Sequence, residues 1–231
     1  MKNFKRYPTG NSKTKIAFNT RWLVVDVGSG HNPHPRANVL VDRFIYDNTE
    51  RSGQKLVLPN NKYFVAADAC AIPFKDKSFD FAICSHVAEH IDNVETLFLE
   101  LNRVAKKGYL ETPSKIAEII RHAPNHRWFI SKQRNKIICS PATEKYPLRQ
   151  FGKLFFSLYF YKNIQSRGRD VFSFAQGCSK PLHYFFAFTR WCLYHFSLLL
   201  KPLTYTRILW KDGFSWQIKL NTSFARDNAD E

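Results

Sequence analysis

Two glycines and two acids near the start of the chain have the types and spacing of a ligand site. Gly28 and Gly30 end the apolar run from Trp22 to Val27. Glycine reaches positive φ without a Cβ penalty and lets a ligand lie against bare backbone. Asp42 ends the next apolar run, 16 residues after Asp26. A carboxylate at a strand tip beside a glycine turn can accept hydrogen bonds from both hydroxyls of a ribose. Asp26, flanked by valines, is costly to bury unless paired, so we expect it to order the glycine turn or to bind an ammonium group of the ligand.

Three histidines are candidate general bases. His86 and His90 lie in the stretch S-H-V-A-E-H-I, and His126 lies in A-P-N-H-R-W-F. A general base contributes roughly 10²- to 10⁴-fold, where the substrate must lose a proton. For His86 we favour a packing or ligand-contacting role over catalysis. The five cysteines have neither C-x-x-C nor metal-ligand spacing, so we expect reduced thiols and no metal site.

Alternating apolar runs and a helical stripe position these residues. Five runs predict strands, and the apolar spacing from Val94 to Val104 predicts a helix, with Asp92 as a candidate N-cap and Gly108 as a candidate C-cap. Strands alternating with helices or loops predict an α/β fold with a mostly parallel sheet. The strand runs are Trp22 to Val27, Val39 to Asp42, Tyr63 to Ala67, Phe79 to Cys84 and Tyr109 to Thr112.

Five ordered motifs over residues 20–115 resemble the class I S-adenosylmethionine-dependent methyltransferases, and most closely the type 11 group. They are V-V-D-V-G-S-G, the acid Asp42, D-A-C-A-I-P-F with S-F-D three residues later, S-H-V-A-E-H-I, and a last strand that leads into E-T-P-S. The resemblance implies a Rossmann-like three-layer sandwich with a mostly parallel seven-stranded sheet and an antiparallel closing hairpin.

The resemblance also implies S-adenosylmethionine as cofactor and gives each residue a place around it. The methionine end would lie against Asp26, Gly28 and Gly30, the ribose on Asp42, and the adenine beside Asp68 and Ala69. Ser85 and His86 would line the cofactor cleft. A dinucleotide fold is the competing interpretation, but it requires a small residue three positions after Gly30, where this chain has Pro33.

The second half of the chain is strongly basic and aromatic. Residues 113–220 carry 18 Lys/Arg against 4 Asp/Glu, so most of the net charge of +16 lies there. Such a balance attracts anions, whether nucleic acid, lipid surface or acidic substrate. Within this half, His126 and Trp128 are candidates for the acceptor pocket, with loop packing as the alternative role.

Residues 182–200 form an apolar stretch with one charge, Arg190. An arginine at the bilayer centre costs at least about 2.5 kcal/mol, so we expect a buried cap helix or an interfacial helix on an anionic membrane rather than a membrane span. Tyr205 to Trp210 and Phe214 to Leu220, joined by an Asp-Gly turn, predict a β-hairpin. The predicted organisation is a basic N-terminal segment (1–20), a cofactor-binding core (21–113), an α-rich insertion over the acceptor site (114–203), the closing hairpin (204–220) and a polar tail (221–231).

These features predict a cytoplasmic enzyme that methylates a small-molecule, sugar or lipid-linked acceptor. A peripheral location at a membrane is the option that residues 182–200 leave open. The N-terminal segment has no signal-peptide-like apolar core. An RNA or other nucleic-acid methyltransferase is the alternative, because basic residues with interleaved aromatics can bind phosphates and stack bases. A methyltransferase-like binding protein without turnover is a further alternative.

Overall fold

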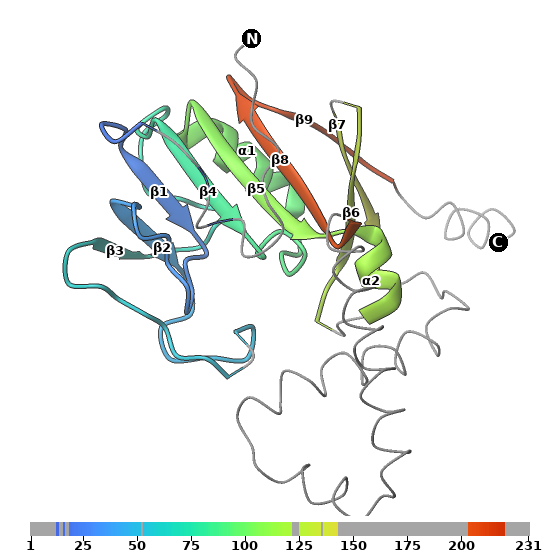
Figure 1. The fold of residues 1–231 in the computed structure, drawn as a ribbon, viewed down its shortest axis with the longest axis horizontal. Helices are drawn as coiled ribbons and strands as arrows, with labels where there is room; N and C mark the ends of the chain where they lie inside the picture. Colours follow the sequence, from blue (N-terminus) through green and yellow to red (C-terminus); the bar gives the residue numbers. More distant parts are fainter. Residues whose placement is uncertain are drawn as a thin grey trace, which may run out of the picture.

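The computed structural model describes residues 13, 16, 19–51, 53–121, 125–134, 136–142 and 203–219. Figure 1 shows the elements, coloured along the chain, arranged in two sheets. They are β1 (Val24–Val27), β2 (Val39–Asp42), β3 (Tyr63–Ala66), β4 (Phe81–Ser85), α1 (Val94–Val104), β5 (Lys107–Pro113), α2 (Lys115–Arg121), β6 (Trp128–Gln133), β7 (Lys136–Pro141), β8 (Tyr205–Lys211) and β9 (Ser215–Ile218).

The larger sheet has the strand order β3-β2-β1-β4-β5-β8. Its first five strands are parallel, and β8 is antiparallel to β5 at the edge. The chain therefore moves outward from β1 in one direction to β2 and β3, and in the other to β4 and β5. This reversal between β1 and β4 is a topological switch point, where open α/β sheets bind ligands beyond the carboxyl ends of their strands. The predicted α/β class with a mostly parallel sheet is confirmed.

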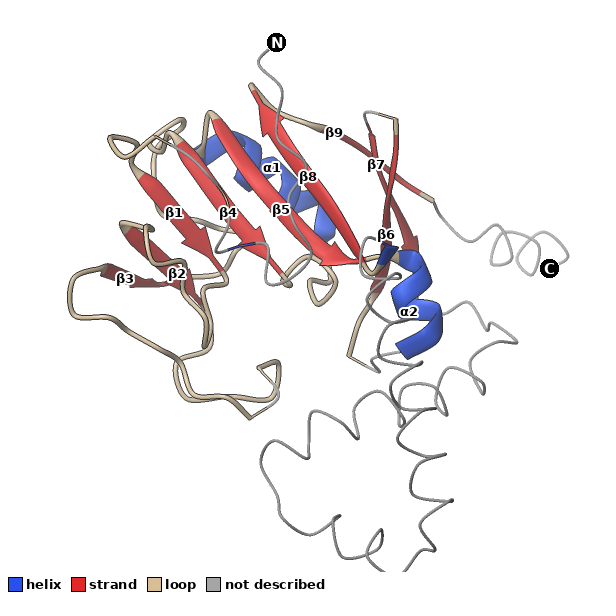
Figure 2. Ribbon diagram, viewed as in Figure 1, coloured by secondary structure: helices blue, strands red, loops and turns tan. Residues whose placement is uncertain are grey.

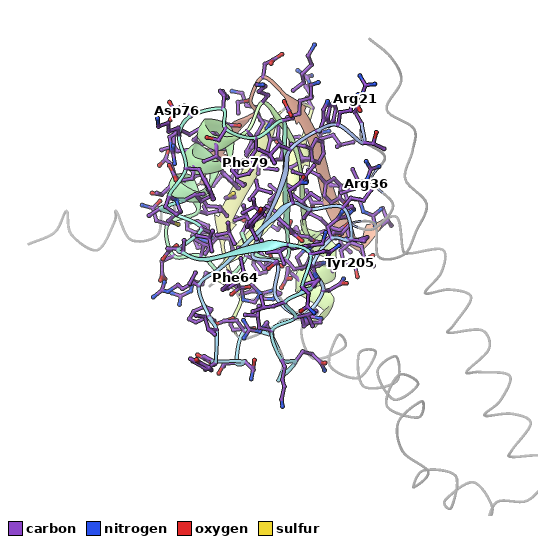
Figure 3. The ribbon with its side chains drawn as sticks, turned by 90° about the vertical axis from the view of Figure 1, so that its left-hand side faces the viewer. Arg21, Arg36, Phe64, Asp76, Phe79 and Tyr205 are labelled. Carbon is purple, nitrogen blue, oxygen red and sulfur yellow. The ribbon has the colours of Figure 1, made fainter. Side chains whose placement is uncertain are left out.

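The central strands are buried throughout, as their unbroken apolar runs predict. Every residue of β1 and β2 is buried, which is typical of parallel strands covered on both faces. The apolar stripe of α1 packs on one face, where Phe79 also lies; Figure 3 shows Phe79 inside the molecule and Asp76, Arg21 and Arg36 at its periphery. On the other face Ile16 packs with residues of β1, β2 and β4.

The connections on the β2 and β3 side are irregular. Figure 2 draws the stretches between β1 and β2 and between β2 and β3 as loops; Pro33 and Pro35 lie in the first of them. Because only α1 and α2 are helices in the part of the chain that the structure describes, the third layer remains a prediction. None of the described helices has the length and apolar character needed to cross a membrane. Residues 182–200 lie outside the described ranges, as does most of the α-rich insertion.

A second, smaller sheet has the order β6-β7-β9. Its strands β6 and β7 lie in the region expected to be an α-rich insertion. The expected closing hairpin is wrong in one respect: β8 joins the main sheet, but β9 pairs in parallel with β7 instead of returning along β8. The Asp-Gly turn redirects the chain here because Phe214 and Trp216 pack on Phe98 of α1. The main sheet accordingly has six described strands rather than seven.

Both predicted caps of α1 are corrected by the structure. The N-cap is Asn93, whose side chain accepts a hydrogen bond from the Thr96 amide, whereas Asp92 pairs with Arg127. At the other end Ala105 is the C-cap, in an extended conformation. Gly108 lies inside β5 instead. A Cβ there would come within 2.1 Å of the Trp210 ring and 2.6 Å of the Ala82 carbonyl oxygen. Glycine therefore lets the Trp210 ring and β4 pack directly on the backbone of β5.

The variant Gly108→Ala is expected to lower the free energy of unfolding by about 1–3 kcal/mol, because overpacking a closed site displaces side chain or backbone. The measurement is urea unfolding of wild type and variant. The same substitution is then made in a Trp210→Phe protein, which lacks the ring atoms that a Cβ would meet. There Gly108→Ala should lower the free energy of unfolding by less. Equal penalties in both backgrounds would contradict the assignment of Trp210 as the obstacle.

Candidate cofactor and acceptor site

A cavity of about 990 Å³ opens at the carboxyl ends of the parallel strands. The residues that follow β1, β2, β3 and β4 all contribute to its wall, as expected for a site at the switch point. The wall includes the predicted residues Gly28, Gly30, Asp42, Asp68, Ala69, Ser85, His86, His90 and His126. The structure thus brings most of the predicted site residues together.

The glycine turn adopts the conformation that its sequence predicts. Gly28 and Gly30 have φ of +68° and +55°, in the left-handed region that favours glycine. The amides of Gly28 and Ser29 donate to the Val41 carbonyl at 2.7 and 3.2 Å, which fixes the turn against β2. A Cβ on Gly28 would lie 2.2 Å from Val87 Cγ2. The loop after β4 therefore places the Val87 side chain in the space that a Cβ at position 28 would need.

Asp42 is buried beside this turn and is held by three donors. Its Oδ2 accepts from the Gly30 amide at 2.9 Å, and its Oδ1 accepts from the Phe44 amide at 2.9 Å and from Arg51 Nη1 at 3.3 Å. An ionised carboxylate has about four lone-pair positions. One position therefore remains for a ribose hydroxyl, and a second becomes available if the longer Arg51 contact opens.

Asp26 lies beneath the turn and is fully buried. Its Oδ2 accepts from the His34 amide at 2.7 Å and pairs with Lys13 Nζ at 2.8 Å. Burial raises the pKa of Asp26 above its ordinary 3.8, although Lys13 and the His34 amide oppose that shift. Its second oxygen, Oδ1, has no hydrogen-bond partner in the structure. Asp26 therefore ties Lys13 and the segment at His34 to β1; the cavity wall does not include it, and its two predicted roles stay predictions.

Asp68 and Ala69 follow β3 at the outer part of the cavity. Asp68 Oδ1 accepts from the Cys70 amide at 2.8 Å, and Oδ2 pairs with Arg43 at 3.0 Å. Ala69 is buried. Asp68 thus ties the end of β3 to the end of β2, and it leaves the small side chain of Ala69 on the cavity wall, in keeping with the predicted place of an adenine.

Ser85 and His86 end β4 and begin the next loop. His86 has a φ of +59°, a conformation that costs a non-glycine residue about 1–3 kcal/mol and is concentrated at functional sites. Its amide donates to the Glu111 carbonyl at 2.8 Å, and its Nδ1 lies 3.1 Å from Glu89 Oε1. Burial opposes the charged imidazole, but the hydrogen bond and charge of Glu89 outweigh it and raise the pKa of His86. Ser85 Oγ donates to Glu111 at 3.4 Å.

His90 and His126 meet at the other end of the cavity. Their rings lie edge to face with centroids 4.6 Å apart. His90 Nδ1 lies 2.8 Å from Glu50 Oε2, and His126 Nδ1 lies 2.7 Å from Glu118 Oε1. Burial lowers the pKa of His90, so its neutral form is favoured. A neutral imidazole can act as a base or as a metal ligand.

Trp128 has a packing position rather than a place in the cavity wall. Its indole Nε1 donates to the Ile91 carbonyl at 2.8 Å, and its ring packs against the main core. It fastens β6 to the loop that carries His90, and the described cavity wall does not include it.

Several residues that organise the site were not predicted. Arg51 binds the Asp42 carboxylate and the carbonyl oxygens of Phe44 and Asp47, so it closes the loop after β2. Glu111, on β5, accepts from Tyr109 and Arg207. The acid in E-T-P-S was the only sequence signal for Glu111, and no local pattern marked Arg51.

The comparison with protein families gives one match. Residues 41–110 match the family described as methyltransferase domain. This range runs from β2 to β5 and includes Asp42, Asp68, Ser85 and His86. The resemblance to class I S-adenosylmethionine-dependent methyltransferases of the type 11 group is thereby confirmed. No curated protein sequence matches the chain.

Solved structures that match the chain include two from bacteria and one from an archaeon. The protein YcgJ of Bacillus subtilis is 20% identical, with 46% of this chain and 55% of that chain covered and a TM-score of 0.35. An S-adenosylmethionine-dependent methyltransferase of Methanosarcina mazei is 18% identical, with coverage of 51% and 69% and a TM-score of 0.35. The 1,6-didemethyltoxoflavin-N1-methyltransferase of Burkholderia thailandensis, with bound S-adenosylhomocysteine, is 15% identical, with coverage of 40% and 45% and a TM-score of 0.30. The chain spans about half the length of YcgJ.

Proposed function

We propose that the protein is an S-adenosylmethionine-dependent methyltransferase. The observation that carries the proposal is the Gly28–Gly30 turn bound to Asp42 at the switch point of the sheet, inside a chain whose residues 41–110 match a methyltransferase domain. The cavity, at about 990 Å³, is at the upper end of the usual range for ligand pockets, about 300–1,000 Å³. It has room for a nucleoside cofactor together with an acceptor.

The residues present fit this cofactor. The positive-φ glycines leave bare backbone at the cavity wall, where a Cβ on Gly28 would collide with Val87. Asp42 keeps lone pairs for ribose hydroxyls, and the buried Ala69 leaves space for a base. When bound, S-adenosylmethionine supplies an activated methyl group on a sulfonium centre.

The chain's own contribution to catalysis is positioning. Holding two reactants in attacking geometry can supply about 7–11 kcal/mol. The glycine turn and the ends of β2 and β3 would orient the donor, and the loop from Ser85 to His90 would separate it from the acceptor. His86, His90 and His126 all reach the cavity, and any of them could take a proton from an acceptor that must lose one.

For the acceptor, a small-molecule, sugar or lipid-linked compound remains our proposal. The histidine-lined end of the cavity supports it, because the carboxylates of Glu50 and Glu89 also line that end and would repel a phosphate backbone. Nucleic acid is the second candidate, supported by the 18 Lys/Arg against 4 Asp/Glu in residues 113–220. Methyl transfer from labelled cofactor into fractionated cell extract would separate them. Label in RNA, together with steeply salt-dependent RNA retention and no binding to anionic liposomes, would overturn our preference.

Titration calorimetry with S-adenosylmethionine tests the cofactor assignment. Asp42→Ala is expected to weaken binding about 10- to 100-fold, since it removes a charged acceptor that is worth about 1.5–3 kcal/mol. Asp76→Ala is the matched control, because Asp76 lies on the surface and pairs with Arg103. No detectable binding by folded wild type would refute the proposed function. Unchanged affinity of Asp42→Ala would refute only the ribose assignment.

A further inference from the structure

Glu89, His90 and His126 form a cluster that the proposed methyl transfer does not require. One carboxylate oxygen of Glu89 and one ring nitrogen of each histidine all lie within 4.8 Å of one another. All three residues line the cavity, so the cluster opens onto the space where an acceptor would bind. The sequence offered no cysteine pair or familiar ligand spacing, and we expected no metal site. The fold brings these three residues together across 37 positions of sequence.

Each histidine of the cluster is oriented by its own carboxylate. Glu50 lies 2.8 Å from Nδ1 of His90, and Glu118 lies 2.7 Å from Nδ1 of His126. A neutral imidazole donates from one nitrogen and keeps a lone pair on the other. Nδ1 faces a carboxylate in both rings, and the Asn125 amide nitrogen also lies 3.3 Å from Nδ1 of His90. The tautomer in which Nδ1 donates to the carboxylate leaves Nε2 with the lone pair. Metal-binding histidines have this carboxylate arrangement, which fixes the tautomer and raises the basicity of the ligand nitrogen.

Glu89 supplies an independent indication that a ligand belongs here. It is 1% exposed, and its Oε1 faces His86 while its Oε2 has no hydrogen-bond partner in the structure. An unpaired carboxylate oxygen in a buried position is costly. Glu89 therefore brings an oxygen without a hydrogen-bond partner to a cluster that also holds two imidazole rings.

We propose that Glu89, His90 and His126 bind a divalent transition-metal ion such as Zn²⁺. Two imidazoles and one carboxylate form the ligand set of open catalytic zinc sites, in which water or substrate takes the fourth position. Imidazole ligands favour zinc and its neighbours over Mg²⁺, which prefers oxygen. Zinc bonds of about 2.0–2.1 Å require the three side chains to move closer together than they lie here.

Resting on the proposed function, this site suits an acceptor that coordinates the ion through a hydroxyl group. A hydroxyl coordinated by the ion loses its proton to solvent more readily, because a metal lowers the pKa of a bound O–H group. The oxygen then forms a bond to the methyl carbon while the carbon–sulfur bond breaks and its electron pair stays on sulfur. The products are a methyl ether, S-adenosylhomocysteine and one proton, so atoms and charge balance.

The experiment measures metal binding to the whole 231-residue chain after chelator treatment and dialysis. Calorimetry with Zn²⁺ and visible absorption with Co²⁺ should show one equivalent bound with a Kd of roughly 1 µM or tighter, and Mg²⁺ should not compete. His90→Ala and His126→Ala should lose this equivalent. His31→Ala is the matched control, because His31 lines the same cavity outside the cluster and should keep it. A Zn²⁺ equivalent that survives in both cluster variants, or absence of binding in wild type, overturns the inference.

A positioning variant distinguishes a designed site from chance histidines. Glu118→Gln should weaken Zn²⁺ binding about 10- to 100-fold, as loss of a carboxylate behind a ligand does, with circular dichroism and thermal unfolding confirming the fold. Unchanged affinity in this folded variant overturns the assigned role of Glu118.

Cofactor binding separates the two proposals. Chelated protein should still bind S-adenosylmethionine while losing methyl transfer to hydroxyl acceptors, and Zn²⁺ should restore it. Cofactor binding without any metal binding refutes the metal site alone. Metal binding without cofactor binding refutes the methyltransferase proposal and leaves the site. Full transfer in the presence of chelator refutes the catalytic role of the ion.

Discussion

The substitution Gly28→Ala is expected to weaken S-adenosylmethionine binding at least about 100-fold, equivalent to roughly 2.7 kcal/mol. Two separate costs add at this residue. An L-residue at a φ of +68° is strained by about 1–2 kcal/mol. In addition, a Cβ would lie 2.2 Å from Val87 Cγ2, so the turn or the loop after β4 must move. Either movement displaces the wall against which the cofactor lies.

Two comparisons separate strain from collision at Gly28. Gly53 also has a positive φ, +77°, but a Cβ there meets nothing within 4 Å, so Gly53→Ala should change the Kd by at most about tenfold. The double variant Gly28→Ala/Val87→Ala removes the colliding methyl group and should recover part of the affinity. Titration calorimetry on folded protein provides the measurement. Wild-type affinity in Gly28→Ala would show that the turn is not part of the cofactor site.

The sequence predicted the core of the fold because its signals there are local. Val39–Asp42 was predicted as a strand and Val94–Val104 as a helix, and both have these bounds in the structure. A buried parallel strand shows as an unbroken apolar run, and an amphipathic helix shows as a periodic stripe. Each pattern reports the burial of its own segment, so no knowledge of distant partners is needed.

Features that depend on distant partners were predicted less well. The Asp-Gly turn before Phe214 indicated a hairpin, but aromatic packing on Phe98 directs β9 to the second sheet. Glycine is a common residue at the end of a helix, but glycine is needed at position 108 because a side chain there would meet Trp210, 102 positions away. A turn or cap signal describes what the backbone can do locally, whereas tertiary contacts decide which of those options is adopted.

The same distinction applies to the site. Gly28, Gly30 and Asp42 were predicted because they lie at strand ends in a spacing that resembles a known family. The carboxylates behind the histidines were not predicted, since Glu50 and Glu118 lie 40 and 8 positions from their partners and belong to no motif. Trp128 was an acceptor-pocket candidate by its place in an aromatic loop, but its indole faces the Ile91 carbonyl. Side-chain direction at the end of a strand was not available from the pattern.

Lys13 and Asp26 form a buried ion pair whose loss is expected to destabilise the protein strongly. Lys13 belongs to a basic, polar segment that gave no sign of a buried role, yet its side chain is 5% exposed and pairs with the fully buried Asp26 at 2.8 Å. Removing one partner of a buried pair leaves an uncompensated charge. Lys13→Met is therefore expected to lower the free energy of unfolding by about 3–5 kcal/mol. The double variant Lys13→Met/Asp26→Asn should lose less than the sum of the two single variants, because it leaves no isolated charge.

Lys13→Met is also expected to change how the stability of the protein depends on pH. Burial already raises the pKa of Asp26 above 3.8, and Lys13 is the foremost influence that opposes the shift, so its removal raises that pKa further. Between the unfolded and folded pKa values the folded state binds the extra proton, and stability falls as pH rises through that interval. Urea unfolding of the variant should therefore show a steeper loss of stability from pH 4 toward neutrality than wild type shows. A variant with wild-type stability and an unchanged pH profile would mean that Asp26 does not depend on Lys13, and that the His34 amide alone holds the carboxylate beneath the glycine turn.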